Sequence, residues 1–443
     1  MKRLAAALAL LLAAAVSPPA PATAASLGRE EIAAILAHGP WPPPAPVDPS
    51  NRVARSASAA RLGARLFFDT RLSADGSLAC SSCHVPEAGW AERRSVAIGL
   101  APTDRNTPSV MDAVFNRWFG WAGSTDSLWA ASLRPLADAR ELGSVERSVP
   151  ARVREAPDLA CGYREAYGMP PPADDERLLA DLGKALAAFQ ATLVSARTPF
   201  DDYRDALARG DREAQARYPA DALRGLRLFV GRAQCSLCHL GPRFTNGEFD
   251  RVGIPTRRPD GRHDWGRYDG VKALRASRHS QLGPHNDDPA RSDTRATRHA
   301  ALDPELLGAF RVPGLRGVER TAPYMHDGSI SSLREVVLHY STISDEKLAL
   351  ATPHPHAEPG DEQPRRAEGN LLRRLDLTAR EIDDLVAFLR SLTPRRAIPR
   401  PPLASASTRC PPAPARATPP GSVRQTTGQF EQHRVLAAGR DQR

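Results

Sequence analysis

The sequence predicts an all-α protein built from two related domains, and three observations support this expectation. A pentad of the form C-x-x-C-H occurs at residues 80–84 and again at residues 235–239. An apolar stretch with helical spacing precedes each pentad, at residues 62–68 and 223–229. Few segments alternate polar and apolar residues with the period of a strand, so strands should be scarce. An apolar helix followed by the same pentad, occurring twice, indicates a duplicated domain.

The two pentads have the pattern of covalent haem attachment. In C-x-x-C-H, two thiols add across the vinyl groups of a haem, and the adjacent imidazole becomes the proximal iron ligand. Zinc is the alternative, but no further C-x-x-C pair lies nearby in the sequence to complete a tetrahedron. We therefore expect two covalently bound haem c groups, held by Cys80, Cys83 and His84 and by Cys235, Cys238 and His239. The expected fold is two cytochrome c-like domains, each with one haem c, packed at an interface.

The N-terminus has the features of a secretory signal, which we place at residues 1–24. Lys2 and Arg3 precede an apolar run that ends at Val16, and residues 22–24 form a small-residue cleavage site. The run is too short to span a bilayer comfortably. We therefore expect a periplasmic protein that does not span the membrane.

The remaining chain divides into two predicted domains and a tail. Residues 25–205 and 206–394 are the expected N-terminal and C-terminal haem c domains, and residues 395–443 the expected disordered tail, rich in proline and arginine. The first domain should begin with a short helix at residues 29–38 and close with an amphipathic helix at residues 176–195.

Two later segments complete the outline. Residues from about 256 to 299 lack periodicity, so we expect a surface excursion with solvated histidines: His263, His279, His285 and His299. The final helix should begin at a capping box formed by Thr378 and Glu381 and end before Pro394.

Charge and the remaining cysteines say little about partners. The net charge is +9, but the predicted signal and the arginine-rich tail account for it, so the body is near neutral and nucleic acid is not implied. Outside the pentads, only Cys161 and Cys410 remain. Their spacing leaves their pairing open. The position of Cys410 in the predicted tail favours two unpaired thiols.

A helix predicted in the second domain, beginning at Ser332, has Tyr340 on its buried face. Ser332 and Glu335 form a capping box at its start. Tyr340 lies seven positions after Leu333 and four after Val336, so it shares their face. Tyr340 is therefore either a buried core tyrosine with a bonded hydroxyl or a ligand for the second iron.

The stretch before this helix reads T-A-P-Y-M-H-D-G, at residues 321–328, and resembles the bacterial di-haem cytochrome c peroxidase and MauG superfamily. The resemblance covers roughly residues 62–392. It implies that Tyr340 is the distal ligand of the second haem, where peroxidase members have methionine. Asn106, Thr321 and Pro323 match the family's calcium position between the domains, and their oxygen donors suit Ca²⁺.

The same resemblance describes the first haem. Peroxidase members have I-G-H-G after the first pentad, and the histidine blocks the iron; here Leu100 stands in its place. The first haem should therefore be five-coordinate and open. Trp121 matches the tryptophan between the haems, and Glu141 matches a distal glutamate that moves a peroxide proton.

Departures from the pattern point to a subgroup. The family's W-D-G-R reads W-A-G-S at residues 121–124, and a pocket glutamine of MauG corresponds to Ala131. Residues 126–129 and 227–232 are closer to MbnH-type di-haem enzymes, which oxidise a tryptophan of a partner protein. The resemblance thus implies an enzyme that uses hydrogen peroxide to oxidise a protein side chain through a two-iron ferryl state.

Two other functions remain open from the sequence. One is a cytochrome c peroxidase that takes electrons from a small cytochrome, for which a methionine-ligated second haem would be expected. The other is a non-enzymatic di-haem electron carrier. The partner is accordingly a periplasmic protein substrate or an electron-donating cytochrome, besides hydrogen peroxide itself.

Overall fold

The structure, a computed structural model, describes residues 27–256, 258, 261–344, 347–348, 371–395 and 410. The predicted signal peptide lies outside these residues. So does the predicted tail, apart from Arg395 and Cys410.

The described chain is mostly helical, as the sequence predicts. The α-helices are α1 (Arg29–Leu36), α2 (Ala57–Phe67), α3 (Cys80–Cys83), α4 (Leu128–Ala137), α5 (Val149–Glu155), α6 (Pro157–Tyr167), α7 (Asp175–Gln190), α8 (Pro199–Arg209), α9 (Arg212–Ala216), α10 (Ala220–Val230), α11 (Arg267–Ala276), α12 (Arg295–Arg298), α13 (Leu333–Ser341) and α15 (Ala379–Ser391). Short 3₁₀ helices cover Thr70–Leu72, Pro86–Ala88, Ala113–Phe115, Cys235–Leu237, Pro304–Leu306 and Val318–Arg320. Strands β1 (Phe249–Asp250) and β2 (Phe310–Arg311) pair antiparallel, with Phe249 opposite Arg311.

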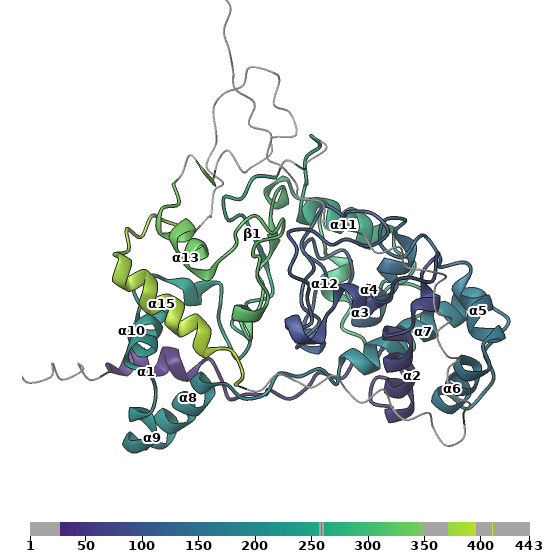
Figure 1. Ribbon diagram of the computed structural model, residues 1–443, viewed down its shortest axis with the longest axis horizontal. Helices are drawn as coiled ribbons and strands as arrows, with labels where there is room; N and C mark the ends of the chain where they lie inside the picture. Colours follow the sequence, from purple (N-terminus) through teal and green to yellow (C-terminus); the bar gives the residue numbers. More distant parts are fainter. Residues whose placement is uncertain are drawn as a thin grey trace, which may run out of the picture.

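Two groups of helices lie side by side, with β1 between them (Figure 1). The first half contains α2–α7 and the pentad at residues 80–84; the second half contains α1, α8–α10, α13, α15 and the pentad at residues 235–239. Each half has its own cluster of buried apolar side chains. The ranges predicted for the two domains remain a prediction.

The two halves repeat one packing arrangement. Helix α2 packs on α7 in the first half, and α10 packs on α15 in the second. Where each of these helix pairs is in contact, α2 or α10 has a glycine, which lies four residues before a phenylalanine of the apolar stretch that precedes the pentad. A Cβ at Gly63 would clash with the Ala185 carbonyl, and one at Gly225 with the Asp384 carbonyl. Glycine lets the helix backbones approach closely at both crossings.

Two segments pack away from their neighbours in the sequence. Helix α1 packs on α8 and α10, and its Ile35 is buried in the cluster of the second half. The excursion with α11 and α12 packs on the first half: Val271 and Leu274 form a buried cluster with Trp118. Neither half is therefore one continuous stretch of chain.

Polar contacts join the first half to the excursion and to the second half. The Arg105 guanidinium binds the Asp264 carboxylate, with Nε donating to Oδ2 at 2.7 Å. The Arg311 amide donates to the Trp121 carbonyl at 2.8 Å, and the Asn106 amide donates to the His326 carbonyl at the same distance. Because these bonds use backbone groups and a fork-shaped ion pair, they fix the orientation of the two halves.

Local predictions can be compared directly with the structure. Ser332 and Glu335 cap α13, and Thr378 and Glu381 cap α15, with both reciprocal bonds present. The expectation of unpaired thiols at Cys161 and Cys410 is wrong, because the two form a disulfide. Its physical reason is a contact between residues 249 positions apart, which spacing in the sequence does not reveal.

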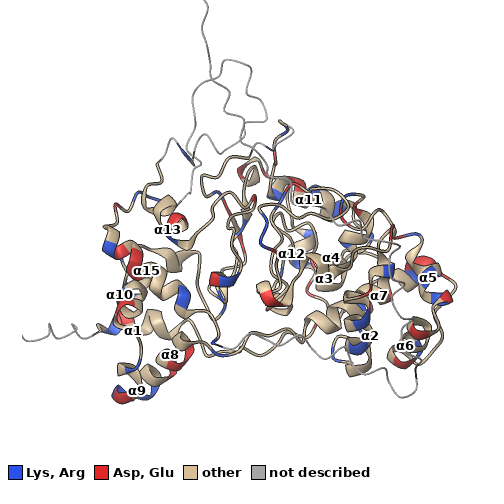
Figure 2. Ribbon diagram, in the orientation of Figure 1, with Lys and Arg blue, Asp and Glu red and all other residues tan. Residues whose placement is uncertain are grey.

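Charged residues occur on both halves. Basic and acidic residues are intermixed along the helices of both halves (Figure 2). Within the described residues, no helix combines the length and apolar character needed to cross a membrane.

Candidate haem and active sites

Both pentad histidines have the same hydrogen-bond arrangement. His84 Nδ1 lies 3.2 Å from the Trp90 carbonyl, and His239 Nδ1 lies 2.9 Å from the Phe244 carbonyl. Donation from Nδ1 to a carbonyl leaves the Nε2 lone pair available for a metal. Burial lowers the pKa of His84 to about 4 and also lowers that of His239, which keeps both imidazoles neutral.

The four pentad cysteines are free thiols at the walls of two cavities. Burial raises the pKa of Cys80, Cys83 and Cys235 to about 12 and that of Cys238 to about 11. Each pair therefore stands as protonated thiols beside its histidine, and two cysteines with an adjacent histidine are the residues that covalent haem attachment uses.

The first cavity has a volume of about 400 Å³ and surrounds His84. Among the described residues that line it, His84 is the only histidine, and methionine, tyrosine and lysine are absent. Leu100 is not on its wall and is 39% exposed. Instead, Gly99 lines the cavity, and it lies so close to the backbone of residues 140 and 141 that a Cβ there would clash. The described wall thus offers no usual sixth iron ligand opposite His84.

Glu141 lies on the wall of this first cavity, just after α4. Its carbonyl accepts from the Leu100 amide at 3.1 Å, which fixes its backbone to the loop after the pentad. Burial raises the pKa of the Glu141 carboxyl, while the guanidinium groups of Arg134 and Arg140 oppose this shift. A carboxyl with a raised pKa exchanges protons closer to neutral pH than an exposed one does.

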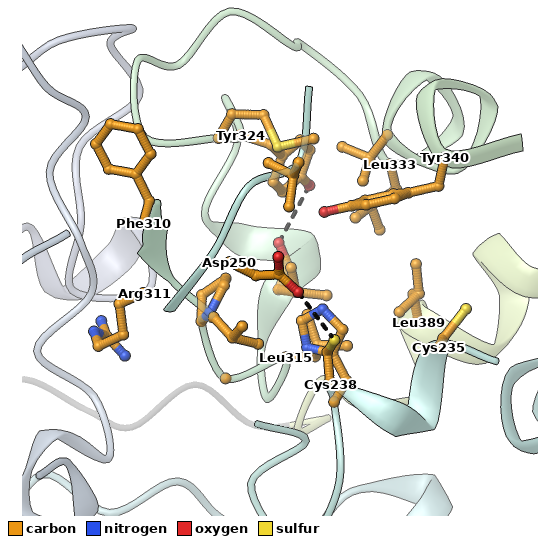
Figure 3. A pocket seen from close by; sticks show the side chains of 18 of the residues that line it. Cys235, Cys238, Asp250, Phe310, Arg311, Leu315, Tyr324, Leu333, Tyr340 and Leu389 are labelled. Atoms are coloured by element: carbon orange, nitrogen blue, oxygen red, sulfur yellow. Dashed lines mark hydrogen bonds between the residues drawn. The ribbon is translucent and has the colours of Figure 1, made fainter. Parts of the chain in front are cut away.

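The second cavity has a volume of about 290 Å³ and surrounds His239. Tyr340 extends from α13 into it, and Cys235 and Cys238 lie on another side (Figure 3). Burial and the nearby thiols raise the pKa of the Tyr340 hydroxyl. Met325 and Tyr324 also line this cavity, but the Tyr324 hydroxyl donates to the Val318 carbonyl at 3.2 Å. Tyr340 thus shares the cavity with His239, as the helical spacing predicts.

The two cavities share a wall. Trp121, Asn106, Asn116 and Arg311 line both of them. Trp121 Nε1 donates to the Asn106 carbonyl at 2.8 Å, and the Trp121 carbonyl accepts from Arg311. Trp121 is therefore held in place between the cavities by bonds at both its ring and its backbone.

Sequence reasoning missed two cations in this wall region. Arg311 is buried, and Arg243 has a buried Nε without a hydrogen-bond partner among the described residues. Neither forms an ion pair with a described carboxylate, and burial lowers the pKa of each to about 10. Arg243 follows the second pentad by four residues, but no motif in the sequence marked either arginine. Asp250, whose carboxylate accepts from Cys238 Sγ at 3.8 Å, was missed for the same reason (Figure 3).

These features fit two haem c groups. Each cavity combines two thiols with a neutral histidine, and the unpaired guanidinium groups suit the anionic propionates that a haem carries. His84, Cys80 and Cys83 would hold the first haem, and His239, Cys235 and Cys238 the second, with Tyr340 as a further ligand.

The three residues predicted to bind calcium line the same cavity. Asn106, Thr321 and Pro323 all line the second cavity. Asn106 Nδ2 donates to the Arg94 carbonyl at 3.0 Å, which leaves its side-chain oxygen free for another contact. A calcium ion at this position remains a prediction.

Comparison with known proteins decides the family. Residues 57–209 match the family model of di-haem cytochrome c peroxidases. The chain is 31% identical over 370 residues to the methylamine utilization protein MauG of Methylorubrum extorquens, which covers 83% of this chain and 87% of that one. The chain belongs to the di-haem cytochrome c peroxidase family. The resemblance found in the sequence is confirmed, and the chain is a haem-dependent oxidoreductase of the peroxidase type.

Other relatives show the range of names within this family. A cytochrome-c peroxidase of Denitromonas iodatirespirans is 32% identical over 396 residues, covering 86% of this chain and 92% of that one. The crystal structure of a MauG-like protein associated with microbial copper homeostasis has a TM-score of 0.58 and 29% identity, covering 82% and 98%. Names of both kinds occur among the relatives, so the reaction has to be argued from the site.

Proposed function

We propose that this protein works in the periplasm and uses hydrogen peroxide to oxidise a side chain of a partner protein. The carrying observation is the position of Tyr340 in the cavity of His239. In the reaction, peroxide takes up two electrons and two protons to give two molecules of water. The partner side chain supplies the two electrons and is the oxidised product.

The first cavity supports peroxide chemistry. A haem c held by His84 would supply an open iron position at which peroxide binds and its O–O bond breaks. Glu141 would take a proton from the attacking peroxide oxygen and return it to the departing one, so that the leaving group departs as water. Because burial raises its pKa, the Glu141 carboxylate takes up a proton more readily than an exposed carboxylate does.

The second cavity supports storage of oxidising equivalents. A tyrosine phenolate is an anionic ligand and favours higher iron oxidation states than a neutral thioether does. Trp121, at the wall common to both cavities, is the connection between them. This arrangement would let the partner be oxidised away from the cavity where peroxide reacts.

A second candidate function is a cytochrome c peroxidase that takes its electrons from a small cytochrome. It is favoured by one observation, the presence of Met325 on the wall of the second cavity. A methionine-ligated second haem has a higher potential and accepts electrons readily. Ligation by Tyr340 therefore predicts a low potential for the second iron, and ligation by Met325 predicts a high one.

Two measurements on the ferric holoprotein distinguish the functions. Electron paramagnetic resonance should show one high-spin haem, and peroxide should react without prior reduction. Mass spectrometry of periplasmic proteins from the same organism, treated with holoprotein and peroxide, should then show side chains oxidised by two electrons. Rapid oxidation of a reduced small cytochrome without side-chain oxidation would favour the peroxidase instead. Two low-spin haems that do not react with peroxide even after reduction would exclude both enzymes.

A further inference from the structure

Two of the four histidines in the excursion are not solvated. His263 and His299 are exposed, but His279 and His285 lie against the first half, with 19% and 16% of their side chains exposed. Both face Glu176, in the first turn of α7. One donor atom from each of these three residues lies within 4.8 Å of the other two. This cluster, Glu176 with His279 and His285, is outside both haem cavities.

The distances within the cluster suit a metal ion better than hydrogen bonds. Glu176 Oε2 lies 3.7 Å from His279 Nε2 and 3.9 Å from His285 Nε2. Both separations exceed the N–H···O range of about 2.7–3.2 Å. Donor atoms bound to one tetrahedral Zn²⁺ at about 2.0–2.2 Å are about 3.4 Å apart. A shift of a few tenths of an ångström would bring each nitrogen to that spacing from the Glu176 oxygen.

Two of the three donor atoms have no other bonding partner. Glu176 Oε2 and His279 Nε2 are buried, and neither has a hydrogen bond among the described residues. A buried polar atom without a partner costs about 1–3 kcal/mol, so such atoms usually mark a missing water or ion.

Neighbouring residues hold the three donors in place. Arg278 Nη1 donates to Glu176 Oε1 at 2.8 Å, which orients the carboxylate and leaves Oε2 free. Lys184 Nζ donates to the His285 carbonyl at 2.8 Å. The Gln281 amide, between the two histidines, donates to the Asp126 carboxylate at 3.0 Å. Such outer bonds position ligands at metal sites.

We propose that Glu176, His279 and His285 bind a divalent transition-metal ion. Their donor atoms favour Zn²⁺, with a fourth position open to water. Two imidazoles and one carboxylate are a donor set that Zn²⁺ takes in proteins. Glu176 is 44% exposed, which leaves the site accessible from solvent. The ion would link α7 of the first half to the loop between α11 and α12. It is separate from the haem irons and independent of the proposed reaction.

The test uses the full holoprotein with both haems, prepared without a polyhistidine tag and dialysed against a chelator. Titration with ZnCl₂ by isothermal calorimetry should give one strong site, and gel-filtered protein should retain one zinc besides its two irons. Zinc-edge X-ray absorption, which iron does not disturb, should report two imidazole nitrogens. The melting temperature should rise with zinc and level off at one equivalent.

Variants decide the assignment. His279→Ala with His285→Ala should lower zinc affinity by about 100-fold or more, since two of three protein donors are lost. The matched control, His263→Ala with His299→Ala, should bind zinc like the unchanged protein. If the first pair loses haem or fails to fold, Glu176→Gln serves instead and should also weaken binding. Zinc binding that is absent from the unchanged protein, equal in both histidine pairs, or unaffected by Glu176→Gln would overturn the proposal.

Discussion

The two cavities contain the same attachment residues but differ in what else faces them. Around His84, the described wall holds a carboxyl, Glu141, and none of the usual sixth ligands. Around His239, the wall holds Tyr340 and Met325 and lacks a counterpart of Glu141 in this position, although Asp250 lies near Cys238. The two cavities thus differ in their side chains, and in the proposed function the first serves proton transfer and the second sets the iron potential. The fold alone would not have distinguished them.

Removing the proton-transfer group should have the largest effect. Glu141→Gln keeps the side-chain size but cannot exchange a proton, so the peroxide reaction should slow by about 100-fold or more. Stopped-flow spectroscopy of the ferric holoprotein measures this rate. Because burial raises the Glu141 pKa above 4.5, the rate should rise with pH through that pKa as the carboxylate forms, and this step should vanish in the variant. Glu87→Gln, at an exposed glutamate near the first pentad, is the control.

Changing the second cavity should alter potential rather than peroxide reactivity. Tyr340→Met replaces a phenolate by a neutral thioether and should raise the potential of the second haem by on the order of 100 mV, within the range that axial ligands span. For one electron this corresponds to about 50-fold in the equilibrium constant. A redox titration measures it, and Tyr324→Phe is the control because Tyr324 lines the same cavity with its hydroxyl bonded to Val318. An unchanged potential would leave Tyr340 as a core residue.

The ion pair between Arg105 of the first half and Asp264 of the excursion should contribute to stability. Burial alone would raise the pKa of Asp264. The guanidinium groups of Arg105 and Arg258 outweigh this effect and lower the pKa from 3.8 to about 2. This shift corresponds to about 2 kcal/mol. A lowered pKa stabilises the folded state above the unfolded value, so the contribution is present above about pH 4 and is lost as the pH falls toward 2.

Asp264→Asn should therefore reduce the free energy of unfolding by about this amount at neutral pH and much less near pH 2. Urea unfolding at both pH values tests it. Asp293→Asn removes an exposed ion pair with Arg295 and should change little. Equal losses in the two variants would refute the role given to Asp264.

The shared wall should show the smallest effect. Trp121→Phe keeps an aromatic ring but loses the Nε1 bond to the Asn106 carbonyl, which is worth about 1 kcal/mol. We expect electron exchange between the haems to slow several-fold while peroxide still reacts at the first haem at its normal rate. Trp118→Phe is the control, since Trp118 is buried but lines neither cavity. A slower reaction with peroxide in Trp121→Phe would mean that Trp121, like Glu141, acts in the peroxide reaction and not in electron exchange.

Local patterns in the sequence predicted local structure well. The pentads place cysteines and histidine within one turn of chain, and the capping boxes at Ser332 and Thr378 fix where α13 and α15 begin. Helical spacing was enough to predict that Tyr340 points inward, because residues three, four and seven positions apart lie on the same face of a helix.

Contacts between distant residues were not predictable in this way. The disulfide of Cys161 with Cys410, and the positions of Arg243 and Arg311 at the second cavity, depend on how the halves pack. The excursion was expected to be solvated because it lacks periodicity. Its histidines at 279 and 285 are partly buried through polar contacts with α7, which leave no periodic apolar signal.

The placement of α1 constrains the order in which the protein folds. A chain is made from its N-terminus, so α1 is synthesised before every other described helix. Its partners come much later: Ile35 is buried among side chains of the second half, and Glu31 pairs with Arg227 of α10. The first half, by contrast, has all its helices between residues 57 and 190 and packs once they are made. The first described helix therefore stays uncovered until the helices of the second half are available.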